Sequence, residues 1–232
     1  MKVEIWSDVV CPFCYIGKRK FEKALEQFGP KDKVEVVWRS FQLDPEMKHV
    51  PGMSVHEYLG KRKGGTTADG KRMNDQMAEM AKEVGLTYDF DNAVINNTLL
   101  AHQLLHLAKT HQKQDQMKER LFAAYYTQGQ NIGDIDTLVR LGEEIGLDGP
   151  EIKEALTKQT YLQEVQEDFI RAQQVGVRGV PFYVFNNKYA VSGAQPTELF
   201  KEVLDKVWEE EKPPTVLGEV TGGTCTPDGV CD

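Results

Sequence analysis

Two pairs of cysteines are the residues in this sequence whose type and spacing could carry out chemistry. The first pair is the motif Cys11-Pro12-Phe13-Cys14, and the second pair is Cys225 and Cys231 near the end of the chain. Two cysteines separated by two residues can cycle between a dithiol and a disulfide, or can supply half of a zinc site. A structural disulfide that closes so short a loop would constrain the unfolded chain only slightly. We therefore predict redox chemistry at the first pair and keep zinc binding as the alternative.

The elements around the first pair predict which of its sulfurs attacks. Residues 3–6 are expected to form a strand, and a helix is expected from Pro12 onward, because apolar residues there recur at helical spacing. Cys11 would then lie at the helix N-terminus, where unpaired backbone N–H groups and the helix dipole favour an anion. The pKa of a thiol in such a place can fall from about 8.5 to roughly 3.5–7.5. We predict Cys11 as the attacking thiolate and Cys14, one turn deeper, as the resolving thiol, with Lys18 adding a positive field.

Length, composition and charge limit the classes of protein to which the chain can belong. A chain of 232 residues is long enough for one large domain or for a domain with an insertion. Its net charge of −8 and pI of about 5.3 argue against a nucleic-acid surface as the main function. No apolar run approaches the roughly 18 residues of a membrane span, and no signal-peptide core precedes the first strand. We therefore expect a cytoplasmic protein, in whose reducing compartment cysteines favour catalysis or metal binding.

The order of the predicted elements is β-α-β, a long helical block, and then a β-hairpin and a helix. The second strand is expected at residues 33–38, so the first βαβ unit should be right-handed with parallel strands. Residues from about 54 to 175 show helical patterns only. A strand pattern returns at 179–185, with Pro181 at its entry, and a return strand is expected at 189–192 after the turn Asn186-Asn187-Lys188. An amphipathic helix follows. Two sheet-forming halves are thus separated by a block of helices.

Three other groups of residues could suggest a site, and each has a simpler interpretation. The basic run 61–65 contains glycine, but it lacks the ending that a phosphate-binding loop needs. His102 and His106 are four residues apart on a predicted helix, a spacing that suits two metal ligands, yet no third ligand is evident. We predict no metal ion there and no cofactor for the protein. A helical stripe of methionines fits core packing better than an adaptable peptide-binding face, and its members are Met73, Met77 and Met80.

The motif and the order of elements together resemble the thioredoxin superfamily. The resemblance rests on Cys11-Pro12-Phe13-Cys14 at the first helix and on Gly179-Val180-Pro181-Phe182 much later, and it covers about residues 1–210. The most similar group is the DsbA-like family with an inserted helical domain. Within that family, the stretch 7–15 and the leaderless start are similar to the cytosolic FrnE-like branch. The resemblance implies an α/β thioredoxin fold with a large inserted all-α domain.

This resemblance divides the chain into four parts. Residues 1–42 and 176–212 would form the two halves of the thioredoxin fold, and residues 43–175 would form the helical insertion between them. Residues 213–232 are rich in glycine, threonine and proline, and would form a flexible tail that carries the second cysteine pair.

The tail cysteines lead to a separate hypothesis. A turn through the residues between Cys225 and Cys231 would bring the two thiols together, and the tail is long enough to reach across the domain. We hypothesise that this pair is a second redox relay that exchanges electrons with Cys11 and Cys14 at a high effective concentration. A structural clip, a regulatory disulfide and a zinc site that combines both pairs are the alternatives.

The family resemblance also assigns roles to residues near the first pair. It implies that Pro181 follows a cis peptide bond and faces the cysteines, and that the backbone of Val180 pairs with an extended substrate by strand addition. It also implies that Pro12 and Phe13 set the reduction potential, by changing how well the thiolate of Cys11 is stabilised relative to the disulfide.

The sequence therefore predicts a thiol–disulfide oxidoreductase of the DsbA-like kind, acting through Cys11 and Cys14 on protein or low-molecular-weight thiols and disulfides. A cellular thiol reductant is a further partner to consider, and no nucleic-acid or membrane partner is expected. The first alternative is a glutathione-dependent transferase or isomerase, because sister families on this fold place serine where Cys11 stands. The second alternative is a zinc-binding module. The sequence does not define the oligomeric state or the direction of the reaction in the cell.

Overall fold

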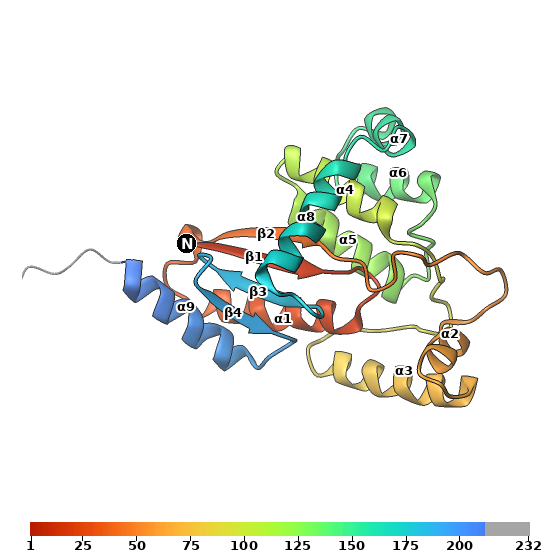
Figure 1. Cartoon of the computed structure of the whole chain (residues 1–232), viewed down its shortest axis with the longest axis horizontal. Coiled ribbons are helices and arrows are strands. Elements are labelled where there is room, and N and C mark those ends of the chain that lie inside the picture. Colours follow the sequence, from red (N-terminus) through yellow and green to blue (C-terminus); the bar gives the residue numbers. More distant parts are fainter. Residues whose placement is uncertain (212–232) are drawn as a thin grey trace, which may run out of the picture.

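The computed structural model describes residues 1–211, which are built around one four-stranded mixed sheet (Figure 1). Strand β1 (Lys2–Ser7) is central and pairs in parallel with β2 (Glu35–Ser40). On its other side β1 pairs antiparallel with β3 (Phe182–Phe185), which in turn pairs antiparallel with β4 (Tyr189–Ser192). The strand order β2-β1-β3-β4 therefore joins the N-terminal βαβ unit to the C-terminal hairpin in one sheet.

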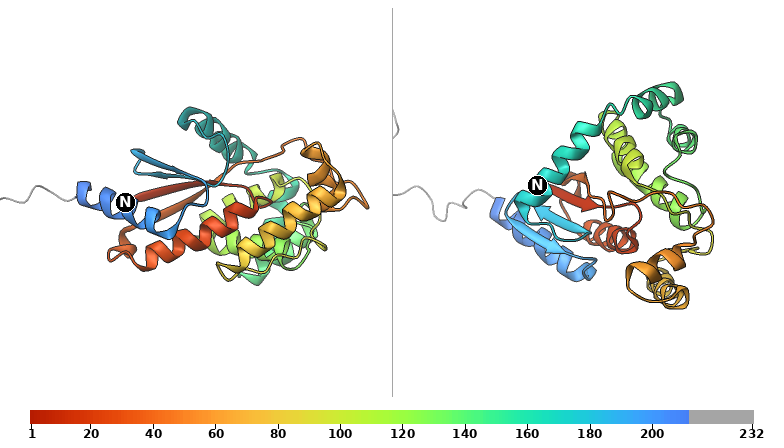
Figure 2. Two further views of the ribbon diagram at one scale, coloured as in Figure 1. Left: turned by 90° about the horizontal axis from the view of Figure 1, so that it is seen from below. Right: turned by 45° about the vertical axis from the view of Figure 1, so that its right-hand side comes forward.

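Helices cover both faces of the sheet (Figure 2). Helix α1 (Pro12–Glu26) and helix α9 (Thr197–Glu211) pack on one face, in a core that includes Phe21, Tyr183 and Phe200. Helix α8 (Leu162–Val175) packs on the opposite face, where Trp6 and Val184 meet Ala172. The last helix of the segment that the sequence assigned to the insertion is therefore a layer of the α/β unit.

The remaining helices form a lobe beside the sheet, with α2 and α3 lying apart from α4–α7 (Figure 1). All of them lie between β2 and β3 in the sequence, and a second large core extends through them to the residues of the first cysteine pair. Their bounds are α2 Val55–Arg62, α3 Thr67–Lys82, α4 Leu99–Thr110, α5 Gln114–Tyr126, α6 Ile135–Glu144 and α7 Gly149–Thr157. The α/β thioredoxin fold with a large helical insertion is confirmed. No helix of residues 1–211 is both long and apolar enough to span a membrane.

Two boundaries differ from those predicted. Strand β2 lies two residues later than expected, because Lys31–Lys33 forms a 3-10 turn and pairing begins at Lys2 with Glu35. Helix α4 begins at Leu99 instead of near residue 93, because the side chain of Asn97 accepts a hydrogen bond from the Leu99 N–H at 2.8 Å. In both places a local hydrogen-bonding group, and not the apolar pattern, determines where the element starts.

The hairpin turn has the geometry that its residues favour. Asn186 and Asn187 both have positive φ values, of 49° and 55°. Two such residues in succession form the tight turn whose twist matches that of paired strands, and asparagine tolerates this conformation better than most residues. The turn predicted between β3 and β4 is therefore confirmed.

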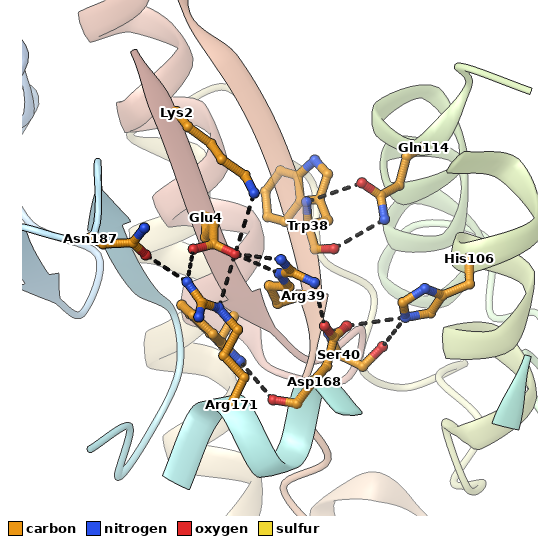
Figure 3. Close-up of polar contacts among 11 residues, drawn as sticks. Lys2, Glu4, Trp38, Arg39, Ser40, His106, Gln114, Asp168, Arg171 and Asn187 are labelled. Atoms are coloured by element: carbon orange, nitrogen blue, oxygen red, sulfur yellow. Dashed lines mark hydrogen bonds and ion pairs between the residues drawn. The ribbon is translucent and has the colours of Figure 1, made fainter. Parts of the chain in front are cut away.

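A buried network of ion pairs holds α8 and α4 against the edge strand β2 (Figure 3). Glu4 accepts hydrogen bonds from Arg39 and Arg171, and Arg39 also donates to Asp168 at 2.8 Å. Asp168 further accepts from the Ser40 N–H at 2.8 Å and lies 3.1 Å from Nε2 of His106. We call these residues the Glu4–Asp168 network. They fix the lobe to the sheet, and so fix the walls of the site described next.

Candidate active site

Cys11 lies where β1 has ended and α1 begins, as the sequence predicted. It is the N-cap of α1, with extended backbone angles, and Pro12 is the first residue of the helix. The Cys11 N–H donates to the Asp8 carbonyl at 3.3 Å, and the Cys14 N–H donates to the Cys11 carbonyl at 3.0 Å. This turn places both side chains at the N-terminal end of the helix, where its dipole is positive.

The two thiols are free and differ in their access to the surface. Cys14 is fully buried, whereas Cys11 is 4% exposed and lines a cavity of about 520 Å³. Phe13 is 39% exposed beside it. A substrate that enters the cavity therefore meets the sulfur of Cys11 first.

The loop before β3 closes over the cysteine turn. The Val180–Pro181 peptide bond is cis, and the Cys11 thiol donates to the Val180 carbonyl at 3.4 Å. Pro181 and Tyr183 approach α1 closely at Gly17, where an added Cβ would lie 2.6 Å from the Tyr183 hydroxyl oxygen. A side chain at position 17 would therefore push the helix away from the hairpin, so glycine allows the close approach of the two segments.

The helical lobe also contacts the motif. The Tyr88 hydroxyl donates to the Pro12 carbonyl at 2.8 Å, and the Tyr88 ring stacks on Tyr126 of α5 at a centroid distance of 4.3 Å. Tyr15, which follows Cys14 directly, stacks on Phe122 at 4.6 Å. The cysteine turn is therefore enclosed by the lobe on one side and by the Val180 loop on the other.

The ionisation of the pair differs from the prediction. The interaction with the neighbouring Cys14, together with burial, raises the pKa of Cys11 well above its usual value, and the charge of Asp8 adds to this. Burial alone would raise the pKa of Cys14 too, but the hydrogen bond from Cys11 and the charge of Lys118 lower it. Ionisation of Cys14 is thus favoured over ionisation of Cys11. The prediction that Cys11 has the lowered pKa is wrong, because the neighbouring Cys14 and burial outweigh the position of Cys11 at the helix end.

The positive charge that acts on Cys14 is that of Lys118, and not that of Lys18 as the sequence suggested. Lys18 is buried but forms ion pairs with Glu22, Asp115 at 3.4 Å and Glu119 at 3.1 Å. Three carboxylates more than offset its charge. The cation without such partners is Lys118 of α5, whose pKa burial lowers to about 8.

Sequence reasoning did not identify Lys118 as a residue of the site. It follows the buried Met117 and precedes Phe122 by four residues, so helical spacing places it on the inward face of α5. This spacing could have indicated from the sequence that Lys118 faces the core. It was obscured by the neighbouring charges of Asp115, Glu119 and Arg120, which indicate a solvated helix.

Asp8 and the two helix histidines take part in buried hydrogen bonds. The Asp8 carboxylate accepts from the Leu43 N–H at 2.8 Å and lies 3.3 Å from Nε2 of His102. These contacts lower the pKa of Asp8 despite its burial. His106 contacts Asp168 and Ser40 instead. Within residues 1–211, no cluster of three or more histidine, cysteine or acidic side chains is placed to hold a metal ion.

The cavity beside Cys11 is lined mainly by apolar side chains of the lobe. Met73 and Met77 of α3 contribute to it, so part of the methionine stripe faces this cavity as well as the core. Arg62 and Lys63 of the basic run also line it, and Arg62 is held by the Leu43 carbonyl at 2.8 Å. The cavity therefore combines an apolar wall with these two cationic groups and with the carboxylates of Asp8 and Asp44.

Comparison with known proteins defines the class of the chain. Residues 2–205 match the family model of the DsbA-like thioredoxin domain. The chain is also 33% identical over 205 residues to the uncharacterized protein YwbO of Bacillus subtilis (strain 168), a match that covers 87% of this chain and 94% of that protein. The protein belongs to the DsbA-like thioredoxin family.

Solved structures place the whole chain in the same class. A probable DsbA oxidoreductase from Streptomyces coelicolor is 37% identical, with a TM-score of 0.85 and coverage of 100% of this chain and 98% of that one. The cytosolic disulfide reductase DsbM from Pseudomonas aeruginosa, solved with GSH, shares the fold at 16% identity, with a TM-score of 0.62 and coverage of 90% and 100%.

The structure brings most of the predicted site residues together. Cys11, Pro12 and Phe13 line one cavity with Val180, and Cys14 lies behind them. The prediction for the second pair, Cys225 and Cys231, lies outside the described residues, as does the predicted tail.

Proposed function

We propose that the protein is a thiol–disulfide oxidoreductase that acts through Cys11 and Cys14. The observation that carries this proposal is the asymmetry of the pair: the sulfur of Cys11 lines the cavity, and the fully buried sulfur of Cys14 lies behind it. Such an arrangement suits a nucleophile that captures a substrate and a second thiol that releases it.

The reaction begins when a proton moves from Cys11 to Cys14. The Cys11 thiolate then attacks a substrate disulfide and forms a mixed disulfide, while the first substrate thiol leaves. Cys14 next attacks the sulfur of Cys11, and the second substrate thiol is released as the protein disulfide forms. In the opposite direction, the oxidised pair accepts two electrons from substrate thiols.

The substrate groups that fit are thiols and disulfides carried on peptides or on small molecules. The apolar wall beside Cys11 suits an apolar neighbour of the reacting cysteine, and the backbone of Val180 is the proposed partner of an extended substrate. The likeness to a cytosolic reductase solved with GSH supports a low-molecular-weight thiol as a further partner.

Two finer assignments belong to this proposal. Pro12 and Phe13 are proposed to set the reduction potential, and the Tyr88 contact to the Pro12 carbonyl gives the lobe a means to influence them. The membership of the FrnE-like branch is a proposal that rests on the stretch 7–15, and the cytoplasmic location is a proposal supported by the likeness to a cytosolic disulfide reductase.

The test compares the wild type with Cys11→Ser and Cys14→Ser variants in an insulin-reduction assay and in an oxidative refolding assay. We expect the wild type to catalyse both reactions, Cys11→Ser to be inactive, and Cys14→Ser to stop at the mixed disulfide. Full turnover by Cys14→Ser with glutathione as co-substrate would instead support the transferase or isomerase alternative, which needs Cys11 only. Stoichiometric zinc in the purified protein would support the metal-binding alternative.

The relay hypothesis for Cys225 and Cys231 has its own test. If these residues exchange electrons with the first pair, then replacing both by serine changes the redox state and the exchange kinetics of Cys11 in the intact chain. Unaltered kinetics and redox state would exclude the relay.

A further inference from the structure

Lys118 is a buried cation that forms no hydrogen bond or ion pair with another residue of the described part of the chain. Its side chain is 0% exposed, and its Nζ atom has no hydrogen-bond partner among residues 1–211. The nitrogen lies over two aromatic rings, 5.5 Å from the centroid of Trp38 and 4.9 Å from that of Phe122. Aromatic faces attract a cation, but they do not replace the hydrogen bonds that an ammonium group loses on burial. An uncompensated group of this kind is retained at a cost, which points to a role beyond packing.

Contacts around Lys118 connect it to the cysteine turn. Phe122, under the ammonium group, stacks on Tyr15, the residue after Cys14. Trp38, the other ring, donates through its indole N–H to Asp115 at 2.8 Å, and so fixes α5 against β2. The ammonium group is therefore held by aromatic rings, one of which stacks on the residue that follows Cys14.

Several ionisable groups surround Lys118, and they act on it in opposite directions. The charges of Cys14, Asp8 and Cys11 favour its protonated form, in that order, whereas burial and the charge of Lys18 oppose it. From α4, His102 also feels the field, since the charge of Lys118 helps to lower the pKa of that imidazole. Asp8 has its own partners in His102 and the Leu43 N–H. Asp8 and Cys14 are thus the two groups whose negative charges favour the Lys118 ammonium most, and of these only Cys14 belongs to the redox pair.

We propose that Lys118 is a positioning residue of the redox reaction: it is the buried counter-ion of the Cys14 thiolate, and it releases its proton when the two cysteines form a disulfide. This inference rests on the proposed function, because it concerns a step of that reaction. It adds the residue that holds the charge of the resolving sulfur, and it links oxidation of the pair to the protonation of a lysine.

When the protein reduces a substrate disulfide, two electrons and two protons pass from the protein to the substrate. The reduced protein holds one proton between Cys11 and Cys14, one negative charge on the pair, and an ammonium group at Lys118. The first substrate sulfur leaves and takes up the shared proton, which leaves Cys14 as a thiolate. That thiolate attacks Cys11, the bond from Cys11 to the second substrate sulfur breaks, and its electron pair leaves with the substrate.

Lys118 supplies the second proton. Once the disulfide has formed, the thiolate charge is gone and the ammonium group is buried without an anion. Its proton passes through solvent to the second leaving thiolate. Two electrons and two protons have then moved from the protein to the substrate, and Lys118 is a neutral amine.

The proposal predicts that Lys118 stabilises the reduced state relative to the disulfide. Replacing it by methionine keeps the length and most of the volume of the side chain but removes the charge. In Lys118→Met we expect the pKa of the first thiol to rise by about one unit, and the equilibrium constant for reduction of the protein disulfide to fall about tenfold. Tenfold corresponds to a reduction potential lower by about 30 mV.

The first experiment measures the thiolate absorbance of the reduced protein against pH, and the reduction potential against glutathione, for the wild type, Lys118→Met and Lys23→Met. Lys23 is an exposed lysine on the same helix as Cys14, so its variant controls for net charge. We expect both quantities to shift in Lys118→Met and to remain unchanged in Lys23→Met. Equal values in all three proteins would overturn the proposal, as would equal shifts in both variants.

A second experiment needs no variant. Nuclear magnetic resonance of isotope-labelled lysine side chains follows the titration of Lys118 in the reduced and oxidised wild type. We expect its pKa to be lower in the oxidised protein, and an unchanged pKa would overturn the proposal. A wild type that titrates in this way but shows no disulfide exchange would refute the proposed function alone, so the two failures are distinguishable.

Discussion

Two lysines are buried where α1 meets α5, and they differ in the number of carboxylates that they reach. Lys18 is 2% exposed and pairs with three acidic side chains, whereas Lys118 is 0% exposed and pairs with none among the described residues. A paired buried charge contributes to the joining of two elements. An unpaired one destabilises the fold but keeps its electric field available to whatever anion forms beside it. The comparison indicates that one lysine serves the architecture and the other the chemistry.

The Glu4–Asp168 network extends the same contrast to the contact of β1 and β2 with α8 and α4. There two carboxylates and two guanidinium groups satisfy one another, together with His106 and a backbone N–H (Figure 3). Near the cysteines, by contrast, the Nζ of Lys118 has no such partner. The fold therefore concentrates satisfied charges where the lobe is attached and leaves an unsatisfied charge where a thiolate has to be stabilised.

The largest expected effect comes from breaking the satisfied network. Glu4→Gln removes the charge that Arg39 and Arg171 share, and leaves both cations partly buried. We expect the free energy of unfolding to fall by about 3–5 kcal/mol, which is usual when one partner of a buried ion pair is lost. Urea unfolding measures this, with Lys2→Ala as the control. Lys2 reaches the same carboxylate from a position that is 42% exposed, at 3.8 Å, so its loss should cost less than about 1 kcal/mol.

Replacing each of the two buried lysines by methionine should change the free energy of unfolding in opposite directions. Lys18→Met leaves three carboxylates without their common cation, and we expect it to lower the free energy of unfolding at pH 7 by about 2 kcal/mol. Lys118→Met should raise it by about 1–3 kcal/mol. The pKa of Lys118 is about 8, below the value near 10.4 of an unfolded lysine, so the folded state binds its proton less tightly.

Because the pKa of Lys118 is lower in the folded than in the unfolded protein, the effect of Lys118→Met on stability depends on pH. The cost of charging Lys118 is fully present below pH 8 and is relieved as the pH rises from about 8 to about 10.4, where only the unfolded chain still holds the proton. The stability difference between Lys118→Met and the wild type should therefore narrow over this range. If Lys118→Met lost as much stability as Lys18→Met, the contrast between a paired Lys18 and an unpaired Lys118 would be contradicted.

Protonating Glu119, one of the carboxylates that pair with Lys18, should have a smaller effect on the free energy of unfolding. Burial would raise the pKa of Glu119, but hydrogen bonds from Arg19 and the charge of Lys18 lower it to about 2. The stability that this carboxylate contributes is present above its unfolded pKa near 4.3 and is lost as the pH falls toward 2. Because about a third of the side chain is exposed, we expect about 1 kcal/mol. Unfolding curves of Glu119→Gln, compared with the wild type between these values, should lack that loss.

The sequence predicted the features of the site that depend on local order. The position of Cys11 at a helix N-terminus follows from a short strand, a proline and an apolar helical pattern, all within about 20 residues. The hairpin follows from two asparagines at its turn. The family resemblance supplied the α/β thioredoxin fold and the place of Val180 and Pro181 beside the cysteines.

The features that depend on distant contacts were not predictable in this way. Lys118 is buried because α5 packs against Trp38 of β2 and against α1, and a run of charges around it suggested exposure. The direction of the Cys11 pKa was mispredicted for the same reason. Cys14 and burial act most strongly on the Cys11 sulfur, and the burial comes from packing against the lobe and the Val180 loop, which the local pattern does not reveal.

The central claim is that Cys11 is the sulfur that meets the substrate while Cys14 lies behind it. The most direct measurement is the mapping of mixed disulfides by mass spectrometry, after Cys14→Ser and Cys11→Ser have each reacted with a peptide disulfide. The account predicts an adduct on Cys11 in the first variant and none on Cys14 in the second. An adduct on Cys14 that forms as fast as that on Cys11 would contradict it.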